Sequence, residues 1–211
     1  MAASSSKRQT IHRAHRIHPY FFSVEKRILD CVVSFFGLIA AAPLFFVIGI
    51  SIIFSSGLPI FFVQERVGLG GRIFRMYKFR TMYVGAHADQ KKYLKKNQAP
   101  APMFKIFDDP RFIGIGHFLS GTGLDELPQF WNVLRGEMSL VGPRPLPMQE
   151  AKKLGAEWQF RFAVKPGIFS QWTVSNKRHT SQKWWLKLER DTVREGSMWG
   201  DVMTVVRTLW R

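Results

Sequence analysis

The sequence predicts an α+β protein that is mainly helical, with a re-entrant membrane hairpin of the form helix–break–helix and a small domain on the cytoplasmic side. The first observation is the stretch 31–54, which carries no charged side chain; about 20 apolar helical residues match a bilayer core. The second is a pair of β-prone runs around a Gly-rich turn, which predicts a short β-hairpin. The third is a set of aromatic and basic stretches, such as 104–119, which predict amphipathic interfacial helices.

Three parts are expected along the chain: a basic N-terminal tail over 1–23, the membrane segment over 24–56 and the domain over 57–211. The tail either contacts anionic headgroups or is solvated without a role. The formal net charge of +16 favours anionic partners, namely anionic membrane lipids and phosphorylated substrates. Nucleic acid is not expected, because no zinc-finger or RNA-binding motif is present. The single cysteine, Cys31, excludes a disulfide within the chain.

Pro43 lies in the middle of the apolar stretch and is expected to break the membrane helix there, because proline removes a helical hydrogen bond and clashes with the preceding turn. Two arms of about 12 residues would each be roughly 18 Å long, too short for a core of about 30 Å. Basic residues flank the stretch on both sides, and they favour the cytoplasmic side. We therefore expect a hairpin that returns to the cytoplasmic face, with a kinked membrane-spanning helix as the alternative.

The expected β-hairpin joins the runs 59–66 and 72–82 through the Gly-rich segment 68–71. On the second run, Lys78 and Arg80 would project from the same face, because side chains alternate along a strand. Together they could clamp a phosphate group. Without further context, a solvated strand face is the commoner interpretation of such a pair.

The segment 124–136 predicts a helix with recognisable ends: Asp125 as N-cap, Pro128 in the first turn and Gly136 as the stop. Asp125 and Glu126 would then lie where free backbone N–H groups and the helix dipole favour anions and keep a carboxylate ionised. An ionised pair of this kind can hold a divalent cation or supply a nucleophile. For an isolated Asp-Glu pair, a capping Asp followed by a first-turn Glu is the commoner interpretation.

A rigid Pro-rich loop is expected over 139–147, with Arg144 between Pro143 and Pro145. The prolines restrict the loop, and a guanidinium can bind a phosphate group through two hydrogen bonds. Alone, this pattern is also typical of a turn with an exposed arginine.

Four blocks occur in one order behind the apolar segment: KFRTM at 78–82, LDELPQ at 124–129, WNVLRGEMSLVGPRP at 131–145 and VKPGI at 164–168. With these blocks, the sequence resembles the bacterial sugar transferase family, the polyprenyl-phosphate sugar-1-phosphate transferases, over residues 24–205. The resemblance implies the small monotopic form, in which a re-entrant helix holds a catalytic domain at the cytoplasmic face of the bacterial inner membrane.

The activity implied by the resemblance is transfer of a sugar-1-phosphate from a nucleotide sugar, usually a UDP-sugar, to undecaprenyl phosphate, with release of UMP. This would be the first membrane step of polysaccharide or glycoconjugate assembly. The implied mechanism is ping-pong, through a covalent aspartyl-phosphosugar intermediate. Further partners left open are a second copy of the chain and downstream glycosyltransferases.

The resemblance also assigns roles to residues. Asp125 would be the nucleophile, Glu126 would assist it, and both would bind Mg²⁺, which neutralises pyrophosphate oxygens. Substrate phosphates would be bound by Lys78, Arg80 and Arg144. Residues with a nucleotide-binding or purely structural role would be Gln129, Asn132, Pro143 and Pro145.

Three features depart from the family pattern. Ala42 precedes Pro43 where the family has serine, and Ser120 and Gly121 occupy positions that are usually basic. The pattern that usually follows Ile168 is blurred. The missing basic pair leaves room for an alternative function, a non-catalytic basic membrane-anchored scaffold of a glycan-assembly complex.

Overall fold

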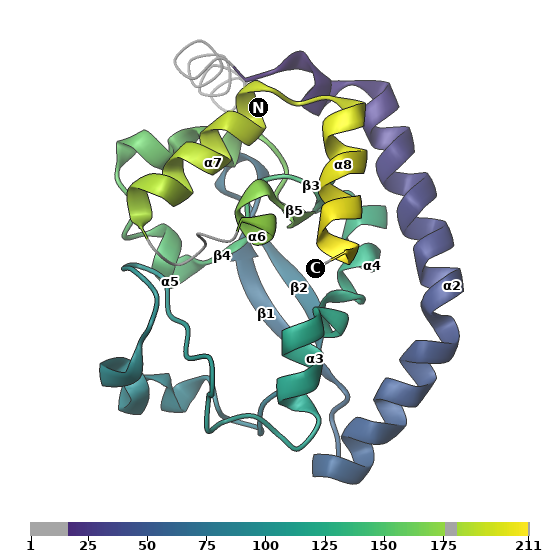
Figure 1. The fold of residues 1–211 in the computed structure, drawn as a ribbon, viewed down its shortest axis with the longest axis vertical. Helices are drawn as coiled ribbons and strands as arrows, with labels where there is room; N and C mark the ends of the chain where they lie inside the picture. The colour runs from purple at the N-terminus through teal and green to yellow at the C-terminus, as the bar shows by residue number, and fades with distance from the viewer. Residues whose placement is uncertain (1–16, 176–180, 211) are drawn as a thin grey trace.

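The computed structural model describes residues 17–175 and 181–210. It confirms a mainly helical α+β fold: short strands lie in the middle, helices surround them, and one long helix runs along the side (Figure 1). Most of the predicted basic tail lies outside the described residues. Its last residues form the short 3-10 helix η1 (Pro19–Phe22).

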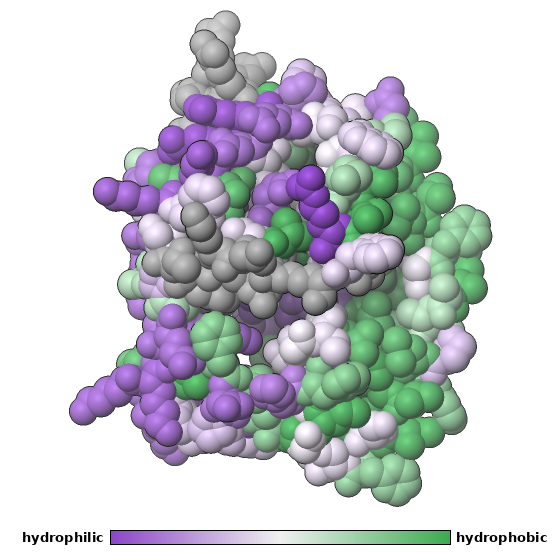
Figure 2. Space-filling model, viewed as in Figure 1, coloured by the Kyte–Doolittle hydropathy of each residue, from purple (hydrophilic) through white to green (hydrophobic). Residues whose placement is uncertain are grey.

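The long helix is α2 (Val24–Ser56), which covers the residues predicted for the membrane segment. Ser23 caps its start, where the Ser23 hydroxyl accepts a hydrogen bond from the Lys26 N–H at 3.1 Å. By length and composition α2 could cross a membrane, and only 11% of its most apolar window is buried. Figure 2 shows hydrophobic residues concentrated along the side of the molecule where α2 runs. This exposed apolar face is consistent with membrane association.

The predicted break at Pro43 is wrong as a break in secondary structure, because α2 continues through Pro43 as one helix. In Figure 1 the helix changes direction near its middle. A proline removes one hydrogen bond and can bend a helix without ending it. The structure therefore has one bent helix instead of two separate arms.

Both ends of α2 pack against the same domain. Near the start, Asp30 Oδ1 accepts hydrogen bonds from the Ser139 hydroxyl at 3.1 Å and from the Leu140 N–H at 3.0 Å. Near the end, Ile48 and Ile52 are buried in a cluster with Phe79, Ile113 and Leu119. The exposed apolar side chains of α2 include Val32, Phe35, Phe36, Ile39, Phe46 and Val47. The helix is therefore attached to the domain at both ends and exposed between them.

The predicted hairpin is confirmed: β1 (Phe61–Val67) pairs antiparallel with β2 (Ile73–Phe79). Between them lies η2 (Leu69–Gly71), where Gly70 and Gly71 have φ values of 67° and 77° that favour glycine. The Pro-rich segment predicted as a loop contains two short strands. These are β4 (Leu146–Pro147), antiparallel to β1, and β3 (Ser139–Val141), parallel to β5 (Gly167–Phe169).

The helix predicted over 124–136 is divided into the 3-10 turn η4 (Leu124–Glu126) and α4 (Gln129–Leu134). Gly123, with φ 76°, precedes η4, so Asp125 lies inside the turn and is not its cap. Pro128 lies at the junction, where it has no N–H to donate to an α-helical ladder. The other helices are η3 (Ala88–Lys96), α3 (Gly116–Thr122), α5 (Met148–Ala151), η5 (Ala156–Ala163), α6 (Gln171–Val174), α7 (Gln182–Arg194) and α8 (Met198–Leu209).

Candidate active site

Lys78 joins the two carboxylates of the LDELPQ block. Its ammonium lies 3.3 Å from Asp125 Oδ2 and 2.6 Å from Glu126 Oε1. Lys78 comes from β2 and the carboxylates from η4, so the site forms where the hairpin meets this turn. Asp125 is buried, with 6% of its surface exposed. The structure therefore brings together three of the predicted site residues.

Asn132 of α4 holds the edge of β2 beside this site. Asn132 Oδ1 accepts a hydrogen bond from the Tyr77 N–H at 3.1 Å, and Asn132 Nδ2 donates to the Arg75 carbonyl at 2.7 Å. These bonds are those that a neighbouring strand would supply. Asn132 is fully buried. Of its two predicted roles, nucleotide contact or structure, these contacts support the structural one.

Gln129 lies one turn before Asn132 and is 2% exposed. Its Nε2 makes no hydrogen bond within the described residues. A buried amide donor without a partner carries a desolvation cost. The contacts of Gln129 therefore do not decide between its two predicted roles, nucleotide contact and packing.

The two carboxyl groups titrate differently. Burial raises the pKa of Asp125 and repulsion by Glu126 raises it further, against the attraction of Lys78. Burial also acts to raise the pKa of Glu126, but attraction by Lys78, Arg144 and Arg66 holds it below its ordinary value. The expectation that this setting keeps both carboxyl groups ionised is thus wrong in direction for Asp125, because burial outweighs the attraction of Lys78. For Glu126 the direction is as expected, but the cause is the neighbouring cations.

Arg144 faces the same region from the Pro-rich segment. Its backbone N–H donates to Glu189 Oε1 at 3.0 Å, and its carbonyl accepts from Arg161 Nη2 at 2.5 Å. Its guanidinium lies 5.2 Å from the centroid of the Trp172 ring and makes no hydrogen bond within the described residues. Pro143 and Pro145 are buried on either side. The backbone is thus fixed while the charged group is left available for a ligand.

Two cations of the site were not predicted. Arg66 donates to the Pro145 carbonyl at 3.0 Å, and burial with the charge of Arg144 lowers the pKa of Arg66 to about 9. The charge of Lys105 lowers the pKa of Asp125, against the net upward shift. The sequence pattern placed Arg66 only as a flank of the membrane segment. No local pattern separates Lys105 from other surface lysines.

Arg80 has other partners. It is 4% exposed, and its Nη2 donates to the Ser56 hydroxyl at 2.7 Å and to the Ser56 carbonyl at 3.1 Å, while its Nη1 donates to the Leu58 carbonyl at 3.2 Å. These acceptors lie at the C-terminal end of α2. β2 ends at Phe79, so the alternation that placed Arg80 beside Lys78 no longer applies. These contacts support a structural role and give no support to phosphate binding.

The donor set of the site fits Mg²⁺ only in part. In the described part of the chain, no group of three or more His, Cys, Asp or Glu residues could hold a metal ion. Mg²⁺ commonly uses one or two carboxylates together with waters and substrate phosphates. Asp125 and Glu126, which share Lys78 in this structure, supply the two carboxylates. The prediction of Mg²⁺ therefore stays a prediction that depends on bound substrate.

Comparison with known proteins gives the family. A sequence model described as "Bacterial sugar transferase" matches residues 21–211. The chain is 40% identical over 201 residues to the galactosyl transferase CpsE of Streptococcus agalactiae, covering 92% of this chain and 43% of the relative. It is 36% identical over 199 residues to the UDP-glucose:undecaprenyl-phosphate glucose-1-phosphate transferase of Xanthomonas campestris pv. campestris, covering 90% and 39%.

A shorter relative is the exopolysaccharide production protein ExoY of Sinorhizobium fredii, 33% identical over 190 residues, covering 88% of this chain and 84% of the relative. The chain thus spans less than half of CpsE and of the Xanthomonas enzyme, but most of ExoY. The family match includes the hairpin, the carboxylates of η4 and the Arg144 segment. The chain therefore belongs to the bacterial sugar transferase family.

Proposed function

We propose that this protein transfers a sugar-1-phosphate from a UDP-sugar to undecaprenyl phosphate and releases UMP, as the first membrane step of polysaccharide or glycoconjugate assembly. The observation that carries the proposal is the contact of Lys78 with Asp125 and Glu126, in the field of Arg66 and Arg144. Both substrates are phosphate anions, so a carboxylate can react with them only in a strongly cationic site. The name of the Xanthomonas relative describes a reaction of this kind.

The proposed mechanism uses Asp125 as the nucleophile. Its carboxylate attacks the sugar-bearing phosphorus, the bond from that phosphorus to the bridging oxygen breaks, and UMP leaves with that oxygen. A phosphate oxygen of undecaprenyl phosphate then attacks the aspartyl-phosphosugar and releases Asp125. Lys78 stabilises the ionised carboxylate, and Arg66 and Arg144 neutralise charge on the phosphoryl oxygens. Bound by Asp125 and Glu126, Mg²⁺ would add charge neutralisation at the pyrophosphate.

A monotopic, re-entrant arrangement at the cytoplasmic face is also part of the proposal. Asp30 and Ile48 lie 18 positions apart in α2, which is about 27 Å of helix. Both contact the same domain. A straight membrane-spanning helix would carry one of these contacts across a core of about 30 Å. The bend in α2 and its exposed apolar middle support entry and return on one side (Figure 1).

The test is UMP release from a panel of UDP-sugars with undecaprenyl phosphate and Mg²⁺, for the wild type, Asp125→Asn and Asp108→Asn. Asp108 is a matched control because its side chain is fully exposed. We expect release by the wild type and Asp108→Asn only. Turnover by Asp125→Asn would remove Asp125 as nucleophile. No release by the wild type with any donor would favour the scaffold alternative.

A further inference from the structure

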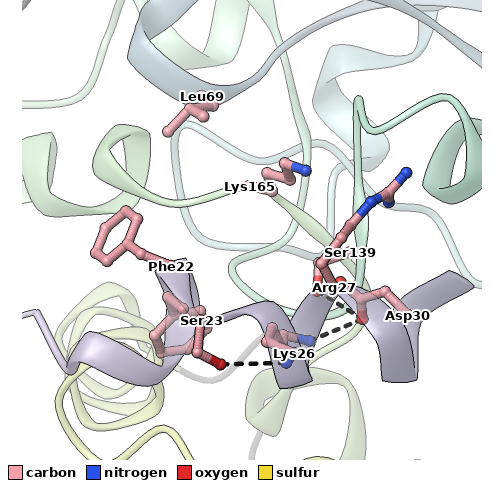
Figure 3. A pocket seen from close by; sticks show the side chains of 9 residues that line it. Phe22, Ser23, Lys26, Arg27, Asp30, Leu69, Ser139 and Lys165 are labelled. Carbon is pink, nitrogen blue, oxygen red and sulfur yellow. Dashed lines mark hydrogen bonds and ion pairs between the residues drawn. The ribbon is translucent and has the colours of Figure 1, made fainter.

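A cavity of 230 Å³ lies at the start of α2, and none of its lining residues belongs to the site around Lys78. Lys26, Arg27 and Asp30 line it from α2, and Lys165 lines it from the turn before β5. Phe22 and Leu69 supply apolar surface (Figure 3). The cavity therefore combines three cations, one carboxylate and an apolar wall at the N-terminal end of α2.

The cations of this cavity differ in their partners. Lys26 Nζ is paired with Asp30 at 2.9 Å and with Asp201 at 2.7 Å. Arg27 donates to the Val133 carbonyl at 2.7 Å and to the Leu134 carbonyl at 2.9 Å. Its guanidinium carries five N–H groups, so donors remain.

Lys165 is half-buried, and its ammonium makes no hydrogen bond or ion pair within the described residues. It ends close to Arg27. A Cβ atom placed on Gly136 would lie 3.7 Å from both Arg27 Nη2 and Lys165 Nζ. Burial and repulsion by Arg27 lower the pKa of Lys165, against the attraction of Asp30, the one carboxylate in the lining. Two positively charged groups thus approach the same side of Gly136.

An anion with several acceptor oxygens would relieve this repulsion and fill the free donors. A phosphate group fits both a guanidinium and an ammonium ion. Phe22 lines the cavity and is 49% exposed, so one apolar side chain at its mouth is open to a ligand. An acyl chain attached to the phosphate could contact Phe22 and Leu69, the apolar residues of the lining. Basic pockets beside membrane helices on the cytoplasmic side bind anionic headgroups.

We propose that this cavity binds one anionic phospholipid, with Arg27 and Lys165 holding the headgroup phosphate and Phe22 and Leu69 contacting the start of an acyl chain. The bound lipid would fix the start of α2 at headgroup height. The site is separate from the proposed acceptor site.

The experiment uses the full chain in nanodiscs made of equal parts phosphatidylglycerol and phosphatidylcholine. Native mass spectrometry counts the lipids that each protein retains after release. We expect the wild type to retain one phosphatidylglycerol, Lys165→Gln to lose it in most molecules, and Lys165→Arg to retain it. Lys152→Gln is the matched control, because Lys152 is exposed and lies away from the cavity lining; it should behave as the wild type.

Near-UV circular dichroism of each variant checks folding. Retention of phosphatidylglycerol by folded Lys165→Gln would overturn the proposal. Equal retention of phosphatidylcholine by the wild type would overturn the preference for an anionic headgroup. A titration with inorganic phosphate in phosphatidylcholine nanodiscs distinguishes a lipid headgroup from free phosphate as the bound anion. Binding there as tight as that of phosphatidylglycerol would overturn the assignment to a lipid.

Discussion

Asn132 Oδ1 accepts a hydrogen bond from the backbone N–H of Tyr77 at 3.1 Å, which closes the edge of β2 one residue before Lys78. The same side chain donates to Glu137 Oε2 at 2.7 Å. A side chain of α4 thereby takes the place of a strand. The register of β2 against η4, and with it the position of Lys78 between Asp125 and Glu126, depends on this contact.

Replacing Asn132 by alanine should destabilise the protein and misplace Lys78. The change leaves the Tyr77 N–H and the Arg75 carbonyl without partners in a buried setting, and each unsatisfied group costs about 1–3 kcal/mol. We expect a clear fall in Tm and UMP release at least tenfold below the wild type. Lys152→Ala, at an exposed position outside α4 and β2, is the control. An unchanged Tm would show that this edge contact contributes little.

Glu189 should act as a positioning residue for Arg144. Glu189 accepts a hydrogen bond from the Arg144 N–H at 3.0 Å and forms an ion pair with Arg161 at 3.1 Å. Both Glu189 and Arg161 are buried. Removing one partner of a buried ion pair costs about 3–5 kcal/mol. Glu189→Ala should therefore lower Tm strongly.

The conservative variant Glu189→Gln separates position from charge, because its amide oxygen can still accept from the Arg144 N–H. At a temperature where it is folded, we expect a raised KM for the UDP-sugar with a smaller change in kcat. Equal loss in both parameters, or none, would argue against a positioning role. The comparison needs steady-state kinetics on both variants and the wild type.

Local features of the sequence predict the parts of the fold that local interactions determine. The apolar stretch gives α2, and two β-prone runs around Gly70 and Gly71 give the hairpin. Pro43 bends α2 without ending it, a result that depends on how the rest of the helix is held by the domain. The site residues Lys78, Asp125 and Glu126 were predicted through the family resemblance, since an isolated Asp-Glu pair carries no such signal.

Contacts between distant segments could not be predicted. Arg80 turns to the end of α2 because β2 stops at Phe79, and strand length is set by pairing. Arg161 and Glu189 meet through burial of the surrounding tryptophans, from elements that are separate in sequence. Periodicity describes one element at a time and does not report such convergence.

Asp125→Asn should raise the stability of the protein near neutral pH while it removes activity. The pKa of Asp125 in the folded protein lies above its ordinary value of 3.8, so protonation favours the folded state. That contribution is fully present below the unfolded pKa and is lost as pH rises through the folded pKa. The amide cannot ionise, so the variant avoids the cost of a buried charge beside Glu126 that the wild type meets as this carboxyl group loses its proton.

The measurement is Tm of wild type and Asp125→Asn across pH 3 to 8. We expect the stability of the wild type relative to the variant to decline as pH rises above about 4, the ordinary range of this carboxyl group. The substitution leaves Glu126, the other partner of Lys78 at 2.6 Å in the wild type, unchanged. A variant less stable than the wild type at pH 7 would mean that the attraction of Lys78 outweighs burial.

The re-entrant path of α2 predicts that both of its flanks stay on one side of the membrane. With Cys31 replaced by serine, single cysteines can be placed at Ser5 before α2 and at Lys92 after it, where the Lys92 side chain is 73% exposed. We expect neither cysteine to react with a membrane-impermeant thiol reagent in intact cells, and both to react after permeabilisation. A cysteine on the outer surface of the same cells controls for reagent activity. Labelling of one flank alone from outside would establish a membrane-spanning helix, and the contacts of Asp30 and Ile48 with one domain would then need another explanation, because about 27 Å of helix separates them.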